Sequence, residues 1–298
     1  MWVFLGVISS VFLGVYDILK KSSLQNNAVI PVLFFSTVTS SLIFAPFITL
    51  SILDPVTANA LGVHIPTYDI TAHLHFFLKS VIVGSSWVLA YYSLRHLPIT
   101  IVVPIRASGP IWTLIGAIIL FGELLTPMQW AGLGITFFFY YLFSLIGKKE
   151  GIRFAKNKWV FFIFLATIIG TISALYDKFL TAHYDRLSIQ GFFSLYMVLV
   201  LFPVYRFFWY PKRRQDPFTW KFTIPLIGIV LVMADFAYFY SLSYQDSLIS
   251  ILSILRRSSV VYSFVIGAVI FKERNKKQKG YILLGILAGI ALIIFGST

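Results

Sequence analysis

The sequence predicts an all-α membrane protein of ten transmembrane helices, arranged as two inverted five-helix repeats. Three observations predict this: a very apolar composition, a series of long apolar runs, and motifs that recur in the same order in both halves. Of the 298 residues, 58% are hydrophobic and only 12% are charged, whereas soluble domains carry about 25% charged residues. The outer surface is therefore expected to face lipid.

Ten apolar runs have the length of a spanning helix, which needs roughly 20 residues. They are too long and too uniformly apolar for barrel strands, so helices are the structure that can satisfy the backbone in lipid. The first run follows Met1 without a basic segment or cleavage site, and we expect it to be retained. The runs cover residues 2–19, 28–51, 73–94, 98–121, 127–147, 158–181, 189–209, 222–243, 247–271 and 280–296.

Basic residues between the runs are distributed very unevenly. The odd-numbered connections hold 17 Lys and Arg, whereas the even-numbered ones hold only Arg186. By the positive-inside rule, the odd connections are cytoplasmic and both termini lie outside. This asymmetry accounts for most of the net charge of +13, so we expect no nucleic-acid partner. The expected surroundings are a lipid bilayer, either a plasma membrane or a bacterial inner membrane.

An internal repeat relates the two halves. A shift of 150 residues places the stretch from Ile105 to Glu123 on that from Leu255 to Glu273. Each half then holds five runs, and this odd number means that the second half is inserted upside down relative to the first. We expect a first repeat at 1–147, a cytoplasmic linker at 148–157 and a second repeat at 158–298. The repeated residues are Arg106 and Arg256, Ser108 and Ser258, Tyr92-Ser93-Leu94 and Tyr240-Ser241-Leu242, and Tyr16-Asp17 and Tyr176-Asp177.

Several of these motifs carry a family resemblance. The stretch Tyr91 to Pro98, the stretch Pro104 to Pro110, and Phe121-Gly122-Glu123 with Gln129 and Gly132 resemble the EamA branch of the drug/metabolite transporter superfamily. The resemblance covers nearly the whole chain. It implies a secondary transporter that works by alternating access, without ATPase activity or a cofactor.

A narrower resemblance concerns the substrate. Arg256-Arg257 is similar to the Lys-Arg pair of plastid triose-phosphate/phosphate translocators, where the pair and a further base in the fourth helix bind phosphate. Arg106 falls in the corresponding helix here. This resemblance implies a small organic anion, with a phosphorylated metabolite favoured. The alternatives are an exporter of amino acids, drugs or other small metabolites and, in another class, a membrane enzyme acting on lipid phosphates.

Three arginines lie deep within the apolar runs. A charge at that depth costs a few kcal/mol even on lenient insertion scales, so Arg106, Arg256 and Arg257 are candidate substrate-binding residues. The guanidinium group is a planar fork suited to carboxylate or phosphate. The alternative is an internal role, in which each arginine pairs with Asp17, Asp235 or a backbone carbonyl.

Other polar residues within the runs add candidates with open alternatives. Lys79 either adds a positive group to a substrate cavity or extends its ammonium to the headgroups. Asp235 either carries a coupling proton or neutralises an arginine. Four tyrosines, Tyr91, Tyr92, Tyr238 and Tyr240, either bind the substrate or belong to packing and interfacial belts, with Tyr92 and Tyr240 chosen as the substrate-binding candidates.

The pairs Tyr16-Asp17 and Tyr176-Asp177 are expected near the ends of the first and sixth helices, on opposite faces of the membrane. Repeat-related polar pairs at opposite faces would suit alternating gates. The alternative is interfacial anchoring, which is common for tyrosine.

Enzyme chemistry is not expected. Glu123 and Glu273 end helices that run in opposite directions, so they cannot share an acid–base site. The chain has no cysteine and no convincing histidine ligand set, so we expect no catalytic residue and no metal. Gly285 and Gly289 form a GxxxG motif that packs either within one half or at a dimer face, so a monomer and a homodimer both remain open.

Overall fold

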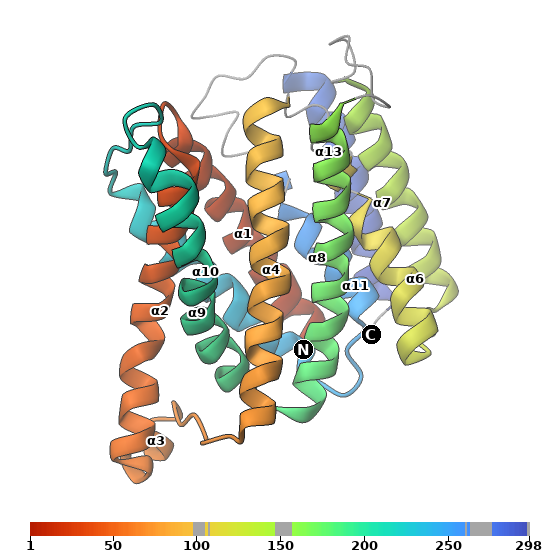
Figure 1. Cartoon of the computed structure of the whole chain (residues 1–298). Helices are drawn as coiled ribbons and strands as arrows, with labels where there is room; N and C mark the ends of the chain where they lie inside the picture. The colour runs from red at the N-terminus through yellow and green to blue at the C-terminus, as the bar shows by residue number, and fades with distance from the viewer. Residues whose placement is uncertain (98–104, 107, 147–156, 260, 263–275, 297–298) are drawn as a thin grey trace.

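The computed structural model describes residues 1–296 except 98–104, 107, 147–156, 260 and 263–275, and the described part is entirely helical apart from its connections (Figure 1). The elements are α1 (Trp2–Leu24), α2 (Val29–Leu53), α3 (Pro55–Ala60), α4 (Ile70–His96), α6 (Gly109–Phe121), α7 (Pro127–Ile146), α8 (Lys158–His183), α9 (Arg186–Pro203), the π-helix η2 (Val204–Trp209), the 3-10 helix η3 (Tyr210–Lys212), α10 (Thr223–Leu242), α11 (Ile249–Arg257) and α13 (Lys276–Phe295).

Six of the described helices are long and apolar enough to cross a membrane: α1, α2, α4, α8, α9 with its continuation to Lys212, and α10. The predicted class, an all-helical membrane protein, is confirmed. Parts of the predicted fourth and ninth spans lie outside the described residues. The number of ten spans therefore stays a prediction.

Several helices begin at polar caps that precede the apolar runs. The carboxylate of Asp69 accepts the N–H of Ala72 at the start of α4, at 3.1 Å. Asn157 and Asp185 play the same role for α8 and α9, because the first amides of a helix have no partner within it. The hydrogen bond from Ala72 also lowers the pKa of the exposed Asp69. These caps explain why α4 and α9 begin a few residues before their apolar runs.

The packing of the two halves follows a reciprocal pattern. In the first half, α1 packs against α10 and α11; the corresponding helix of the second half, α8, packs against α4 and α6. Likewise α2 packs on α10, and α9 packs on α4. Two further pairs join corresponding helices directly, namely α2 with α9 and α7 with α13. α6 also packs against α11; these two helices belong to the fourth predicted span of each half, α6 after Arg106 and α11 up to Arg257. At the level of whole spans, exchanging each span for its counterpart in the other half therefore reproduces the main contacts.

The GxxxG motif joins α13 to α7. A Cβ on Gly289 would lie 2.8 Å from the carbonyl oxygen of Gly132, and a Cβ on Gly132 would lie 2.6 Å from that of Gly289. Gly285 faces the ring of Phe139. The motif thus packs one half against the other, rather than within one half, and these glycines are already covered within the chain.

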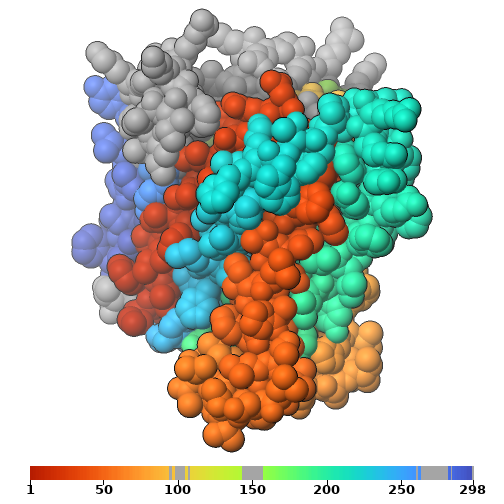
Figure 2. All heavy atoms as spheres, turned by 90° about the vertical axis from the view of Figure 1, so that its left-hand side faces the viewer, coloured from red at the N-terminus to blue at the C-terminus, as the bar shows by residue number. Residues whose placement is uncertain are grey.

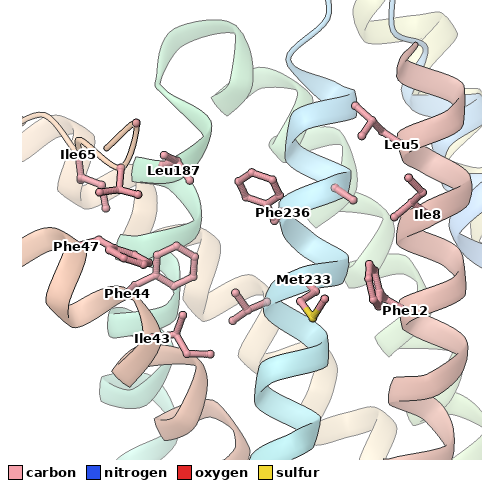
Figure 3. A pocket seen from close by; sticks show the side chains of 14 residues that line it. Leu5, Ile8, Phe12, Ile43, Phe44, Phe47, Ile65, Leu187, Met233 and Phe236 are labelled. Atoms are coloured by element: carbon pink, nitrogen blue, oxygen red, sulfur yellow. The ribbon is translucent and has the colours of Figure 1, made fainter. Parts of the chain in front are cut away.

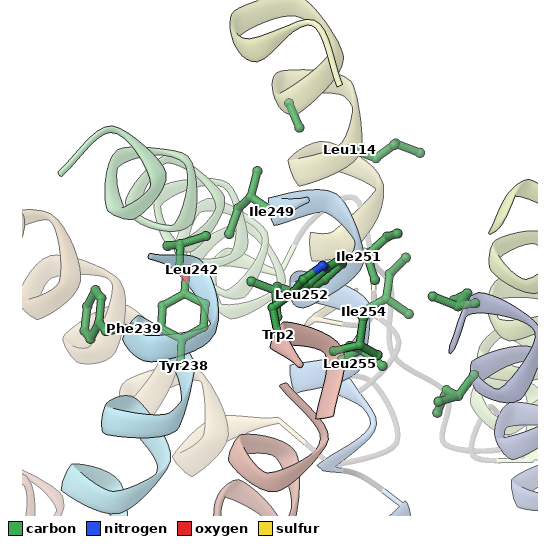
Figure 4. Packing of buried hydrophobic residues seen from close by; sticks show 14 of the residues in the cluster. Trp2, Leu114, Tyr238, Phe239, Leu242, Ile249, Ile251, Leu252, Ile254 and Leu255 are labelled. Carbon is green, nitrogen blue, oxygen red and sulfur yellow. The ribbon is translucent and has the colours of Figure 1, made fainter. Parts of the chain in front are cut away.

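The main apolar core surrounds the short helix α11 (Figure 4). Its side chains Ile251, Leu252, Ile254 and Leu255 are completely buried. Gly6 on α1 allows close approach, since a Cβ there would lie 2.8 Å from Leu252. This packing holds α11 between α1 and α6, and α11 carries two of the candidate arginines at its end.

An apolar groove of about 470 Å³ lies on the side of the helix bundle. In Figure 2, α10 (light blue) is visible between α1 (red) and α2 (orange) on this face. The lining is entirely apolar, with side chains such as Phe12, Phe47, Met233 and Phe236 pointing into the groove (Figure 3). This groove is the larger of the two cavities described. Because no polar side chain of the described residues lines it, it cannot orient a charged metabolite.

Candidate functional site

Lys79 of α4 and Asp177 of α8 form a salt bridge in the interior. Their side chains are only 3% and 8% exposed. The Lys79 ammonium also lies 4.6 Å from the ring centre of Phe193 and 5.1 Å from that of Phe239, and aromatic faces attract such a cation. The structure thus places the Lys79 ammonium in the bundle interior, not at the headgroups.

Arg256, at the end of α11, pairs with Asp235 of α10. Its Nη2 donates to Oδ1 of Asp235 at 2.8 Å, and its guanidinium carbon lies 4.0 Å from the ring centre of Tyr238. Asp177 interacts electrostatically with Arg256 and Asp235 as well as with Lys79. We call this group of Lys79, Asp177, Asp235, Tyr238 and Arg256 the Asp177 cluster.

A second polar group lies around Asp17 in α1. Lys20 is only 8% exposed, and its ammonium lies 4.0 Å from the ring centre of Tyr91 and 5.5 Å from that of Tyr16. Lys20 is attracted by Asp17 and repelled by Arg106. We call Tyr16, Asp17, Lys20, Tyr91 and Arg106 the Asp17 cluster.

The two clusters reproduce the sequence repeat in three dimensions. Each contains an aspartate from the first helix of a half and an arginine from its fourth, Asp17 with Arg106 and Asp177 with Arg256. The serine two residues after each arginine has the same local structure. The hydroxyl of Ser108 donates to the carbonyl of Ile105 at 2.6 Å, and that of Ser258 donates to the carbonyl of Leu255 at 2.5 Å.

These serines also mark where regular helix begins or ends. α6 starts immediately after Ser108, and α11 stops immediately before Ser258. Interrupted helices that carry polar groups at mid-membrane depth are typical of transporter binding sites. Arg106 lies just before the start of α6, and Arg256 and Arg257 are the last residues of α11, so all three arginines lie at such interruptions.

Arg257 links the two clusters. It interacts electrostatically with Arg106 and Arg256, which repel it, and with Asp17, which attracts it. Its Nε is buried and finds no hydrogen-bond partner within the described residues; Nη1 of Arg256 is in the same state. Space for the guanidinium depends on Gly109, because a Cβ there would lie 3.3 Å from Nη2.

Three of the expected residues lie apart from these clusters. The hydroxyl of Tyr176 is hydrogen-bonded to Nδ1 of His75 within an aromatic group, so it does not accompany Asp177. Tyr240 lies against the guanidinium of Arg186, with its ring centre 3.9 Å from Cζ. Tyr92 packs on the small apolar group formed by Ala28, Ile30 and Trp209.

The pairs expected at helix ends lie farther inside. α1 continues to Leu24 and α8 to His183, so Asp17 and Asp177 each precede the end of their helix by about two turns. Both helices are longer than the apolar runs that predict them, because their last residues include polar side chains such as Lys20.

Two residues of the site, Lys20 and Tyr140, are not candidates on sequence grounds. Lys20 was counted with a cytoplasmic connection, although its spacing of four from Tyr16 puts both on one helix face. Of the four tyrosines that the sequence offers, Tyr91 and Tyr238 belong to the clusters, whereas Tyr92 and Tyr240 do not. Tyr140 of α7, which interacts with Arg257, had no distinguishing signal.

The Glu123 carboxylate caps the N-terminus of α11. Glu123 is 6% exposed and accepts hydrogen bonds from the N-terminus of α11. Glu273 lies outside the described residues. Within the described residues, no group of three or more His, Cys, Asp and Glu could hold a metal ion.

Comparison with known proteins places this arrangement in a family. The EamA-like transporter family matches residues 1–145 and 157–295. Among solved structures, 29 chains match; one, titled only "Crystal structure of protein", has a TM-score of 0.71 at 13% identity, covering 99% of this chain and 95% of the other. This similarity shows the fold alone. No curated protein matches the chain. Because the family match extends over both halves, the chain belongs to the EamA-like transporter family, within the drug/metabolite transporter superfamily.

Proposed function

We propose that this small-molecule transporter carries an organic anion, with a phosphorylated metabolite as the favoured substrate. The observation that carries the proposal is the buried Nε of the half-buried Arg257, which has no hydrogen-bond partner among the described residues. A buried charge without full compensation is costly. An anionic substrate would supply the missing interaction.

The charge balance of the two clusters supports an anion. With Arg257 they contain five basic side chains, Lys20, Lys79, Arg106, Arg256 and Arg257, but three carboxylates, Asp17, Asp177 and Asp235. A phosphate monoester carries about −1.5 to −2 at pH 7, which matches this excess. The resemblance of Arg256-Arg257 to the phosphate-binding pair of triose-phosphate translocators favours the same substrate class.

The alternating-access mechanism rests on the repeat. The reciprocal helix contacts and the matching geometry at Ser108 and Ser258 support two halves related by a two-fold axis. The odd number of predicted spans per half makes that axis lie in the membrane plane, with the halves inverted. Asp17 and Asp177 would then be equivalent residues whose interactions with nearby basic side chains break in turn as the two faces open.

The cavity beside Asp235 has a volume of only about 10 Å³, which is enough for about one water molecule. A substrate that reaches Asp235 therefore needs a wider space there than this cavity provides.

Uptake into liposomes tests this function. Vesicles containing the purified protein should accumulate a labelled organic phosphate, and preloading with an unlabelled anion distinguishes exchange from uniport. Uptake of an amino acid or an organic cation, with no response to phosphates, would instead support the general exporter function.

A further inference from the structure

Glu123 caps a helix from the other half of the chain. Its Oε1 accepts the N–H of Ile249 at 2.6 Å, and its Oε2 accepts the N–H and the hydroxyl of Ser250 at 3.2 and 2.5 Å. These partners lie 126 and 127 residues away in sequence. The carboxylate thus joins the end of the first half's fourth helix to the start of α11.

α11 needs this cap because its own sequence does not provide one. The residue before it, Leu248, has no side-chain hydrogen bond to the helix amides, and Ile249 and Ser250 are completely buried. Buried amides without a partner are strongly unfavourable. A carboxylate at the N-terminus and arginines in the last turn also place opposite charges at the favourable ends of the helix dipole.

The backbone of α6 is shaped to present Glu123. Gly122 ends α6 with φ of 63°, a left-handed conformation that glycine adopts without strain. A second contact fixes the same connection, because the ammonium of Lys178 on α8 donates to the carbonyl and the hydroxyl of Ser247. The residues just before α11 are therefore held from two helices.

The distance between the cap and the arginines is fixed by the helix between them. Arg256 and Arg257 follow Ile249 by about two turns, and a helix rises about 1.5 Å per residue. The intervening residues are packed against α1 and α6. A displacement at the N-terminus of α11 is therefore transmitted to its C-terminal arginines.

We propose that Glu123 is a positioning residue, which fixes α11 against α6 and thereby sets the place of Arg256 and Arg257 in the substrate site. The effect on substrate rests on the proposed anion transport; the effect on α11 does not. Glu123 touches α11 and not the substrate, so it acts through the two arginines.

Cross-linking tests the position of α11 without any ligand. The hydroxyls of Ser253 on α11 and Thr113 on α6 lie 3.3 Å apart, and the chain has no cysteine. The double variant Thr113→Cys/Ser253→Cys should form a disulfide with copper phenanthroline. Adding Glu123→Gln should slow that reaction about tenfold, because the amide presents an NH₂ donor to backbone donors and cannot cap both amides.

Two further variants keep the test decisive. Ser250→Ala removes one donor to Glu123 with little change in size, and it should slow cross-linking to a smaller degree. Asp246→Asn is the matched control, an exposed carboxylate in the connection before α11, and it should leave the rate unchanged. If Glu123→Gln and Ser250→Ala both cross-link at the parent rate, Glu123 does not position α11.

The functional consequence has a separate readout. Glu123→Gln should raise the inorganic phosphate concentration for half-maximal thermal stabilisation about tenfold, and Asp246→Asn should not. If the parent protein shows no response to phosphate, the anion function fails while the cross-linking result still decides the role of Glu123 in the fold. If Glu123→Gln slows cross-linking as expected but leaves the phosphate response unchanged, Glu123 is only a structural cap. That result would contradict its role in positioning the arginines for the substrate.

Discussion

Lys79 and Asp177 are bound to each other in the interior, one from each half of the chain. Removing either charge leaves the other buried without its partner, which costs about 3 kcal/mol or more. Lys79→Met and Asp177→Asn should each lower the melting temperature in detergent. The double variant should lose clearly less stability than the sum of the two single variants. Strict additivity would show that the two side chains do not interact.

The contact between α7 and α13 gives a second stability prediction with a control on the same helix. Gly132→Ala should destabilise the protein by about 1–3 kcal/mol, because its Cβ would meet the carbonyl of Gly289 at 2.6 Å. At Gly134, no atom of the described residues outside its own stretch of helix lies within 4 Å of the new Cβ. Gly134→Ala should therefore leave stability unchanged or raise it slightly. Thermal denaturation of the two variants side by side measures the difference, and equal melting temperatures would contradict the close packing.

Orientation in the membrane is the third prediction. In Figure 1 both termini lie toward the end of the bundle where α3 is found, whereas η2 and η3 lie at the opposite end. The basic residues in odd-numbered connections predict that the α3 end is outside. A cysteine added at either terminus should react with an impermeant reagent in intact cells. Labelling only after permeabilisation would reverse the orientation.

The sequence predicts the fold class and the internal repeat better than it predicts which charged side chains pair. The class of fold follows from composition, because too few charged residues are present to cover a water-facing surface. The equivalence of Arg106 and Arg256 is visible in the sequence as a repeat and stays a prediction; Ser108 and Ser258 make the same kind of hydrogen bond, each to the carbonyl three residues before it.

The partners of the charged groups were only partly predictable. Asp235 was one of the two partners proposed for the arginines, and it pairs with Arg256. The salt bridge between Lys79 and Asp177 was not foreseen, because it depends on how α4 packs on α8. Lys20 was assigned to a connection because the apolar run ends before it, whereas α1 continues through it to Leu24. Hydropathy marks the apolar part of a helix and does not mark its polar, buried end.

The central claim is that the buried arginines bind an anion, and the response of thermal stability to ligands tests it most directly. A ligand at a hundredfold excess over its Kd stabilises the protein by about 2.7 kcal/mol. Organic phosphates should raise the melting temperature, whereas neutral sugars and organic cations should not. Arg257→Ala should abolish the rise, and Arg257→Lys should weaken it, since lysine keeps the charge and loses the planar fork. Arg206→Ala, which removes an exposed arginine of η2, should respond as the parent does. Stabilisation by cations, together with a phosphate response that persists in Arg257→Ala, would contradict the account.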